Sequence, residues 1–305
     1  MMINTGFNFS STSSDVIKDI DLTRKRVIVT GGASGIGRET VRTLAMAGAN
    51  VTIAARRLEV AEEVALELRA DTGNSRIEVR SLDLADLQSV RAFVSNWNEP
   101  LDILINNAGI MALPTLERTS EGREMQFGTN FIGHFALTLG LHRYLKEAKE
   151  ARVVSVASSG NLFGPVLWDD IDFSFLPYDP LIAYAQSKTA CILLSVAISR
   201  KWHSDGITSN ALNPGAIATN LQRYTGGLRT PEQYRKTVAQ GAATTVLLAC
   251  SPTLRGVSGR YFDDCNEAPI VNERPNGRLY GVASYALDPQ NADRLWDIAI
   301  EWVQL

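Results

Sequence analysis

The sequence has little cysteine, no excess of basic residues and no long hydrophobic run. Its three cysteines, Cys191, Cys250 and Cys265, include no Cys-x-x-Cys pair, so we expect neither disulfides nor a zinc site. Sparse cysteines also lead us to expect a reducing, cytoplasmic location. With 30 Lys and Arg against 33 Asp and Glu, the net charge is −3, and nothing in this balance suggests a polyanionic partner, so we expect no nucleic-acid binding. The three histidines lack metal-ligand spacing, and we predict no metal.

A membrane span needs about 18 or more consecutive apolar residues, and no stretch of this chain has them. The strongest candidate, residues 191–198, is short and lies in a helical pattern, so we interpret it as part of a buried core helix. Residues 1–21 are polar and lack the apolar segment of a signal peptide. We therefore expect no membrane partner, and a loosely ordered N-terminal extension over residues 1–21.

Short β-branched runs alternate with helical patterns along the rest of the chain. The runs are 26–30, 51–55, 77–82, 101–105, 152–156, 207–212 and 260–262, and the helical patterns are about 36–47, 58–70, 87–97, part of 120–149, and about 182–202. This alternation predicts an α/β protein: a three-layer, doubly wound Rossmann fold with a mostly parallel seven-stranded sheet and helices on both faces. No linker follows Lys25, so residues 22–305 are expected to form one domain, with a C-terminal extension from about 275.

A glycine-rich turn follows the first predicted strand. It contains Gly31, Ser34, Gly35, Ile36 and Gly37 in the segment Thr-Gly-Gly-Ala-Ser-Gly-Ile-Gly. Glycines at such a turn let the backbone approach a pyrophosphate, and the helix N-terminus that follows favours negative charge. The alternative is a plain glycine-rich turn, but its place between a strand and a helix favours a dinucleotide site.

The second predicted strand ends in Ala54-Ala55-Arg56-Arg57, without the acidic residue that binds the ribose of NAD. Arg56 can bind the 2′-phosphate of NADP as a fork, with Arg38 and Ser34 close enough to assist. Solvated arginines at a helix start are the alternative. We predict that NADP(H) is preferred, with NAD(H) as the alternative cofactor.

Tyr184 and Lys188 are four residues apart and lie on one face of a predicted helix. A lysine ammonium beside a tyrosine stabilises its phenolate, which suits proton transfer to a carbonyl oxygen. The pair alone is weak evidence because such spacing is common on surface helices.

Further motifs make the evidence stronger. The glycine turn, Asn106-Asn107-Ala108-Gly109, Ser158, the Tyr184/Lys188 pair and Pro214-Gly215 together resemble the short-chain dehydrogenase/reductase family over about residues 22–270. The long segment between Ser158 and Tyr184, and the sequence around Phe131, resemble its retinol-dehydrogenase-like and protochlorophyllide-reductase-like branch. Asn213 stands where many members of that branch have His.

The resemblance implies a role for each matching residue. Tyr184 would be the general acid/base, Lys188 would tune it and bind ribose, and Ser158 would bond the substrate oxygen. Ser155 and Ser159 are alternatives to Ser158. Asn130 would help relay protons to Lys188. Besides the glycine turn, Arg56, Tyr184 and Lys188, the implied cofactor contacts are Asp83, Leu84, Asn107, Ala108, Gly109, Pro214, Gly215, Ile217 and Thr219.

We therefore expect an NADP(H)-dependent oxidoreductase that interconverts a carbonyl and an alcohol by hydride transfer. The alternatives are a catalytically silent NADP(H)-binding regulator and a C=C reductase on the same fold. Candidates for a pocket that binds a hydrophobic ketone, aldehyde or alcohol are Phe163, Trp168, Tyr178, Leu221 and Tyr224. We expect a homo-oligomer, dimer or tetramer, as is common in this family. Trp296, Ile300 and Val303 predict a docked amphipathic C-terminal helix.

Overall fold

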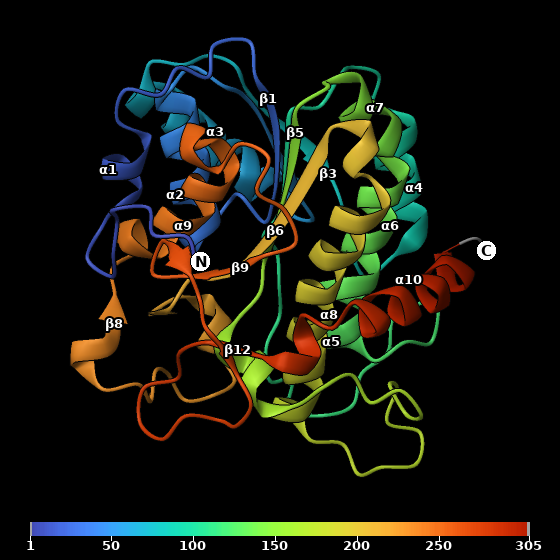
Figure 1. Cartoon of the computed structure of the whole chain (residues 1–305). Helices are drawn as coiled ribbons and strands as arrows, with labels where there is room; N and C mark the ends of the chain where they lie inside the picture. Colours follow the sequence, from blue (N-terminus) through green and yellow to red (C-terminus); the bar gives the residue numbers. More distant parts are fainter. Residues whose placement is uncertain (1, 304–305) are drawn as a thin grey trace.

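A computed structural model describes residues 2–303. Met1, Gln304 and Leu305, at the outer ends of the two predicted extensions, lie outside the described residues. The central sheet has eight strands in the order β10-β9-β6-β5-β4-β1-β2-β3 (Figure 1). They are β1 Arg26–Thr30, β2 Asn50–Ala55, β3 Ile77–Ser81, β4 Ile103–Asn106, β5 Ala151–Val156, β6 Ile207–Asn213, β9 Tyr261–Asp263 and β10 Asn266–Glu267.

Helices cover both faces of this sheet (Figure 1). They are α1 Ser13–Ile17, α2 Gly35–Met46, α3 Leu58–Thr72, α4 Leu87–Ser95, α5 Met125–Phe127, α6 Gly133–Gly140, α7 His142–Glu147, α8 Pro180–Lys201, α9 Val238–Cys250 and α10 Pro289–Val303. Helices α2, α3 and α9 lie on one face, and α4, α6 and α8 on the other. The predicted fold class is confirmed: the expected strands run parallel, and the short β10 adds an antiparallel edge strand.

The inner strands supply two separate cores because successive side chains of a strand point to opposite faces. On β1, Ile28 packs into the core beneath α4, α6 and α8, whereas Val27 and Val29 pack into the core beneath α2, α3 and α9. All three side chains are fully buried. Burial on both faces explains why these runs are continuously apolar rather than alternating.

The segment predicted to contain one long helix is interrupted. Between α5 and α6, residues Gly128–Ile132 form a π-helical turn, and α7 follows α6 as a separate short helix. Close packing accompanies the interruption: a Cβ on Gly133 would lie 2.2 Å from the Leu84 carbonyl oxygen. The π-helical turn places Asn130 in the interior, with none of its surface exposed. The sequence prediction also omitted α9, which is buried along most of its length.

The prediction of a loosely ordered N-terminal extension is wrong. Thr12 caps α1 and forms a reciprocal capping box with Asp15. Val16 on α1 is 3% exposed and packs into the core beneath α2, α3 and α9. Ahead of α1, the Ile3 N–H donates to the Glu267 carboxylate at 3.0 Å, which fastens the segment to β10. The extension therefore covers one edge of the sheet.

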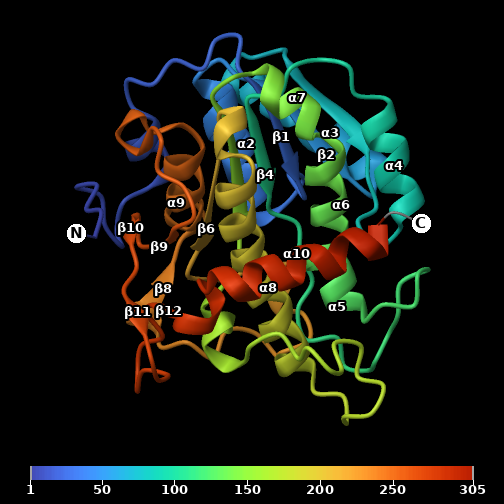
Figure 2. The same ribbon diagram turned by 45° about the vertical axis from the view of Figure 1, so that its right-hand side comes forward.

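The predicted C-terminal helix is present as α10, which runs across α8 (Figure 2). Trp296 lies between two aromatic rings, with centroids 5.0 Å from Phe135 on α6 and 5.4 Å from Trp202 at the end of α8. Leu295 is 1% exposed. The helix therefore belongs to the core. That residues 22–305 form one domain stays a prediction.

Helix α8 is long and apolar enough to cross a membrane by length and composition alone. Its most apolar window is 89% buried inside the molecule, as in the core helix of a globular protein. The interpretation of residues 191–198 as part of a buried core helix is confirmed.

We predict that Leu295→Ala lowers the free energy of unfolding by about 2–5 kcal/mol, the usual cost of truncating a buried leucine. The matched control is Leu66→Ala on α3, where the side chain is 67% exposed and a change within about 0.5 kcal/mol is expected. Urea unfolding monitored by circular dichroism measures both. Equal, small effects would contradict a core position for α10.

Candidate functional site

The predicted site residues gather at one edge of the sheet. Because β1 to β6 run parallel, their carboxyl ends meet at this edge, where ligands bind in open α/β sheets. The strand order reverses between β1 and β4: β2 and β3 continue the sheet beyond β1, whereas β5 and β6 continue it beyond β4. The two strands lie side by side, with Val27 opposite Ile103. The glycine turn follows β1 and Asn107 follows β4, so both lie at this switch point.

The glycine turn packs against the segment after β4 without room for side chains. Gly31 has φ +66°, and a Cβ there would lie 3.0 Å from the Ala108 Cα atom. A Cβ on Gly37 would lie 2.4 Å from the Gly31 carbonyl oxygen and 2.5 Å from Asn107 Nδ2. These glycines are required by the backbone approach itself. Helix α2 begins within this turn at Gly35, after the N-cap residue Ser34, whose side chain makes no capping hydrogen bond.

The loop after β6 completes a cradle around this turn. A Cβ on Gly35, which has φ +52°, would lie 3.3 Å from Thr219 Cγ2. A Cβ on Gly241 would lie 2.7 Å from Ile217 and 3.0 Å from Ile36, so these two predicted cofactor residues are neighbours. A narrow cradle of backbone at a helix N-terminus fits the pyrophosphate of a dinucleotide.

A single buried hydroxyl holds the cradle in place. Thr30 Oγ1 accepts the N–H groups of Asn107 at 2.9 Å and Ala108 at 3.0 Å, and lies 2.8 Å from His134 Nε2. The Asn107 side chain donates to the Thr30 carbonyl at 2.7 Å. The end of β1 is thereby tied to the segment after β4 and to α6.

His134 was expected to be structural or solvated, and it is fully structural. Its Nδ1 lies 2.8 Å from the Asn130 carbonyl oxygen, which can only accept, so Nδ1 carries the proton and Nε2 accepts from Thr30. Burial lowers the pKa of His134 from 6.5 to about 4, and the Lys188 charge acts in the same direction. The ring is neutral at physiological pH.

Asn130 is clamped by its side chain. Its Oδ1 accepts the Ile110 N–H, while its Nδ2 donates to the Ile110 carbonyl and to Ser187 Oγ, each at 2.9 Å. Ser187 Oγ in turn donates to the Tyr184 carbonyl at 2.7 Å. Asn130 therefore connects the segment after Gly109 with the helix that carries Tyr184. Its predicted part in a proton relay stays a prediction.

Tyr184, Lys188 and Ser158 come together as expected. A Cβ on Gly160 would lie 3.1 Å from Tyr184 Cε1 and 3.4 Å from Ser158 Oγ, so the ring and the hydroxyl flank the same glycine. Ser158 Oγ accepts the Gly160 N–H at 3.0 Å. Lys188 Nζ donates to the Val156 carbonyl at 2.9 Å and lies 5.7 Å from the Tyr184 ring centroid. A Cβ on Gly109 would be 3.3 Å from Lys188 Nζ, which brings Gly109 into this group.

The alternatives to Ser158 have other surroundings. Ser155 lies within β5 and is 1% exposed. The Ser159 N–H donates to Asn213 Oδ1 at 3.3 Å. The structure therefore favours Ser158 as the hydroxyl beside Tyr184.

The residues expected at the adenosine end differ in exposure. Arg56 is exposed just after β2, and no ion pair holds it within residues 2–303. Arg38, expected to assist it, instead pairs with Glu67 at 2.8 Å. Asp83 Oδ1 accepts the Ala85 N–H at 3.0 Å, which fixes the turn after β3.

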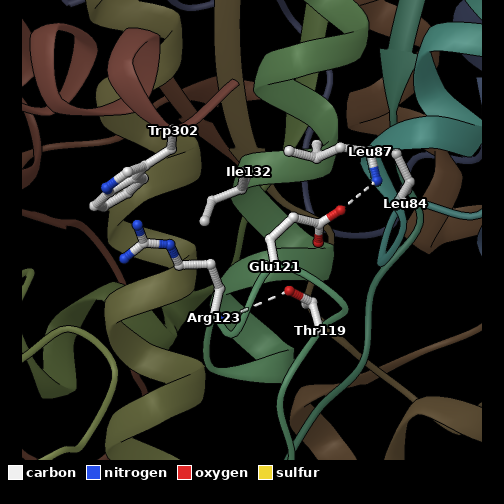
Figure 3. Close-up of a pocket in the computed structure, with 8 residues that line it drawn as sticks. Leu84, Leu87, Thr119, Glu121, Arg123, Ile132 and Trp302 are labelled. Carbon is white, nitrogen blue, oxygen red and sulfur yellow. Dashed lines mark hydrogen bonds between the residues drawn. The ribbon is translucent and has the colours of Figure 1, made fainter. Parts of the chain in front are cut away.

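Leu84 is 6% exposed and lines a small cavity beside Leu87, Ile132 and Trp302 (Figure 3). The cavity volume is about 10 Å³, room for one water at most, so it is no ligand site. In Figure 3, Glu121 bonds the Leu87 N–H at the N-terminus of α4, and Arg123 lies against the Trp302 ring.

The five substrate-pocket candidates divide into two groups. Phe163 is 41% exposed at the end of the 3₁₀-helix Ser159–Phe163, and Tyr224 is 46% exposed just after the 3₁₀-helix Asn220–Gln222, in which Leu221 is half-buried. Trp168 instead packs against the core with Arg294 of α10 stacked on it at 4.6 Å. The Tyr178 hydroxyl donates to the Leu113 carbonyl and accepts from Gln126. Both side chains are thus held by other contacts, and the place of all five candidates in a substrate pocket stays a prediction.

Sequence reasoning missed Asn161, which is fully buried near Ser158. Its Nδ2 donates to the Ser158 carbonyl at 2.9 Å, and its Oδ1 accepts the Ala283 N–H at 2.9 Å. The segment around β12 (Val282–Ala283) is thereby tied to the loop that carries Ser158. Only the three-dimensional structure reveals this link, because the two partners are far apart in the sequence.

The architecture is typical of an oxidoreductase that binds a dinucleotide: a parallel sheet, a glycine cradle at its carboxyl edge, and a Ser/Tyr/Lys group beside it. The family model described as short chain dehydrogenase matches residues 25–227. The chain belongs to the short-chain dehydrogenase/reductase family, which confirms the resemblance stated above.

Three relatives illustrate the relationship. A probable oxidoreductase of Streptomyces antibioticus is 51% identical over 291 residues, covering 91% of this chain and 97% of that protein. Retinol dehydrogenase 12 of Mus musculus is 37% identical over 93% of this chain and 87% of its own, in keeping with the branch suggested above. A Beutenbergia cavernae structure, provisionally described as an NAD(P)-dependent gluconate 5-dehydrogenase with NADP bound at low occupancy, superposes with a TM-score of 0.65, at 28% identity over 80% of this chain and 96% of that one.

We predict that His134 makes stability fall at acid pH. The pKa is about 4 in the folded protein and about 6.5 in an unfolded chain, so the unfolded state binds more protons between these values. Stability from this group is therefore present above pH 6.5 and is lost as the pH falls toward 4. Between pH 7 and 4.5 the loss amounts to about 2 kcal/mol.

Comparison with His134→Gln isolates this contribution, because Asp263, whose pKa is raised to about 7, has the opposite pH dependence over the same range. The measurement is urea unfolding of both proteins at pH 7 and pH 4.5. The difference between wild type and variant should shrink by about 2 kcal/mol at the lower pH. A pH-independent difference would mean that His134 is not held neutral.

Proposed function

We propose that the protein is an NADP(H)-dependent oxidoreductase that interconverts a carbonyl and an alcohol, with Tyr184 as general acid/base. The observation that carries the proposal is the grouping of Tyr184 and Ser158 around Gly160, with Lys188 beside them and the glycine cradle at the same sheet edge. A catalytically silent binding protein would not need these three side chains together.

The residues of the cradle would hold the cofactor. Gly31, Gly35 and Gly37 would face the pyrophosphate, and the N-terminus of α2 would stabilise its charge. Pro214 and Gly215, after β6, would border the nicotinamide. When bound, the cofactor supplies or accepts the hydride.

The protein's own side chains would then handle the proton and the oxygen charge. In reduction, the Tyr184 hydroxyl donates a proton to the carbonyl oxygen as the hydride arrives, and in oxidation its phenolate accepts one. The Lys188 ammonium, held by the Val156 carbonyl, stabilises that phenolate. The Ser158 hydroxyl donates to the substrate oxygen, and its place is fixed by the Gly160 N–H.

The substrate would be a hydrophobic ketone, aldehyde or alcohol, bound between Phe163, Leu221 and Tyr224. The exposed rings of Phe163, in the 3₁₀-helix that follows Ser158, and of Tyr224, in the segment after β6, support this choice. A panel of steroids, quinones, aromatic aldehydes and polyketide-like ketones, followed by NADPH absorbance, would identify the class. Cytoplasmic location and a homo-oligomeric state remain predictions.

Tyr184→Phe should lower kcat by at least 100-fold, because it removes the proton donor and keeps the ring. NADPH affinity, measured by protein fluorescence, should stay within about threefold, since the ring still packs on Gly160. Retained turnover would contradict the acid/base role.

Turnover by the wild type also separates the enzyme from a silent regulator, and mass spectrometry of the product separates carbonyl from C=C reduction.

Arg56→Ala should raise KM for NADPH by about tenfold or more while leaving KM for NADH within about twofold. A charge-assisted bond from Arg56 to the 2′-phosphate, typically 1.5–3 kcal/mol, is lost only with NADPH. Arg57→Ala, at the next exposed arginine, is the matched control and should change neither value strongly. Equal effects of Arg56→Ala on both cofactors would contradict the preference for NADP(H).

A further inference from the structure

Asn213 is the last residue of β6 and directly precedes Pro214 and Gly215. It is 6% exposed, and its Oδ1 accepts two backbone N–H groups, from Ser159 at 3.3 Å and from Gly215 at 3.2 Å. Ser159 follows Ser158 in the chain. One amide oxygen therefore joins the loop of the proposed catalytic serine to the loop after β6.

The orientation of this amide is fixed. Since both partners of Oδ1 are donors, Nδ2 must point the other way, and it donates to the two carboxylate oxygens of Asp263 at 3.3 and 3.2 Å. Asp263 lies directly opposite Asn213, because β9 pairs with β6 in that register. Asp263 is 2% exposed, so its carboxyl group contributes an acceptor inside the protein rather than a surface charge.

The residues beside Asp263 hold the loop after β6 from a second side. Asp264, the next residue, is paired with Lys236 of β8 (Arg235–Lys236) at 2.7 Å, and Arg278 also bonds its carboxylate. Lys236 packs on the other side of the same loop, since a Cβ on Gly215 would lie 2.9 Å from its Cδ atom. Gly215 has φ +93°, a conformation that side chains rarely adopt. The Gly215 backbone is thus fixed from two sides, by Asn213 and by Lys236.

We propose that Asp263 and Asn213 are positioning residues that hold the Ser159 and Gly215 backbones where the nicotinamide half of the cofactor binds. The inference rests on the proposed function, because it assumes that a nicotinamide dinucleotide occupies this edge. Asp263 acts through Asn213: its carboxyl group accepts from the amide and so orients it, and the amide sets the spacing between the two loops. Neither side chain needs to touch the cofactor.

The test compares two asparagines of the same strand. Asn210 on β6 is also 6% exposed, and both ends of its amide are likewise hydrogen-bonded, but to the backbone of Val257 and Arg260 alone. Asn213→Ala and Asn210→Ala should therefore lower stability to a similar extent. Binding of NADPH and of adenosine 2′,5′-bisphosphate, which lacks the nicotinamide half, is then measured by calorimetry on each variant.

Asn213→Ala should raise Kd for NADPH by about tenfold, equivalent to about 1.4 kcal/mol. It should leave Kd for adenosine 2′,5′-bisphosphate within about twofold, because the adenosine end does not contact these loops. Asn210→Ala should change neither value. Asp263→Ala should resemble Asn213→Ala, whereas Asp263→Asn, which keeps an acceptor oxygen, should restore NADPH binding to within about threefold of wild type.

Equal NADPH affinity in wild type and Asn213→Ala, or an equal loss for both ligands, would overturn the inference and leave the proposed function standing. If wild type binds neither NADPH nor NADH, the proposed function itself fails. Should Asn213→Ala not fold, as judged by circular dichroism, the contrast between Asp263→Ala and Asp263→Asn decides. Equal NADPH affinity in those two variants would again overturn it.

Discussion

The hydroxyl of Thr30 is the contact on which the geometry of the site depends. It lies at the end of β1 with none of its surface exposed, and it serves the Asn107 and Ala108 N–H groups and the His134 ring at once. Its removal would take a hydrogen-bond partner from the Ala108 N–H and from the His134 ring, and a buried polar group left unpaired costs about 1–3 kcal/mol. The glycine turn, the segment after β4 and α6 therefore keep one relative position.

The proposed catalytic group is connected to this hydroxyl through hydrogen bonds. His134 bonds the Asn130 carbonyl, and the Asn130 side chain bonds both Ile110 and Ser187, whose hydroxyl bonds the Tyr184 carbonyl. The path joins the cofactor cradle to the helix that carries Tyr184 and Lys188. His134, Asn130, Ser187 and Tyr184 are buried, whereas Ile110 is half-buried. The proposed enzyme would thus have its cofactor and proton donor aligned before a ligand binds.

Features that depend on local sequence were predictable. The strand runs, the glycine turn and the Tyr184/Lys188 pair follow from side-chain periodicity and from the backbone freedom of glycine, and the structure places them as expected. The same holds for α10, where an amphipathic pattern indicated docking. These signals lie within one element, so neighbouring residues are enough to recognise them.

Features that depend on distant contacts were not predictable. The π-helical turn at Asn130, the docked N-terminal segment and the pairing of Arg38 with Glu67 arise from packing between remote segments. Helix α9 escaped prediction because it is apolar on nearly all sides, which removes the contrast that periodicity needs. Thr30, which bonds His134, and Ser159 and Asp263, which bond Asn213, lie at least 50 residues away, so a single sequence gave no sign of these contacts.

A crystal structure of the protein with NADP⁺ would test the central claim most directly. The account predicts the pyrophosphate over Gly31 to Gly37, the 2′-phosphate beside Arg56, and the nicotinamide between Gly215 and the Tyr184 hydroxyl. A dinucleotide bound elsewhere, or one whose nicotinamide lies away from Tyr184 and Ser158, would contradict it.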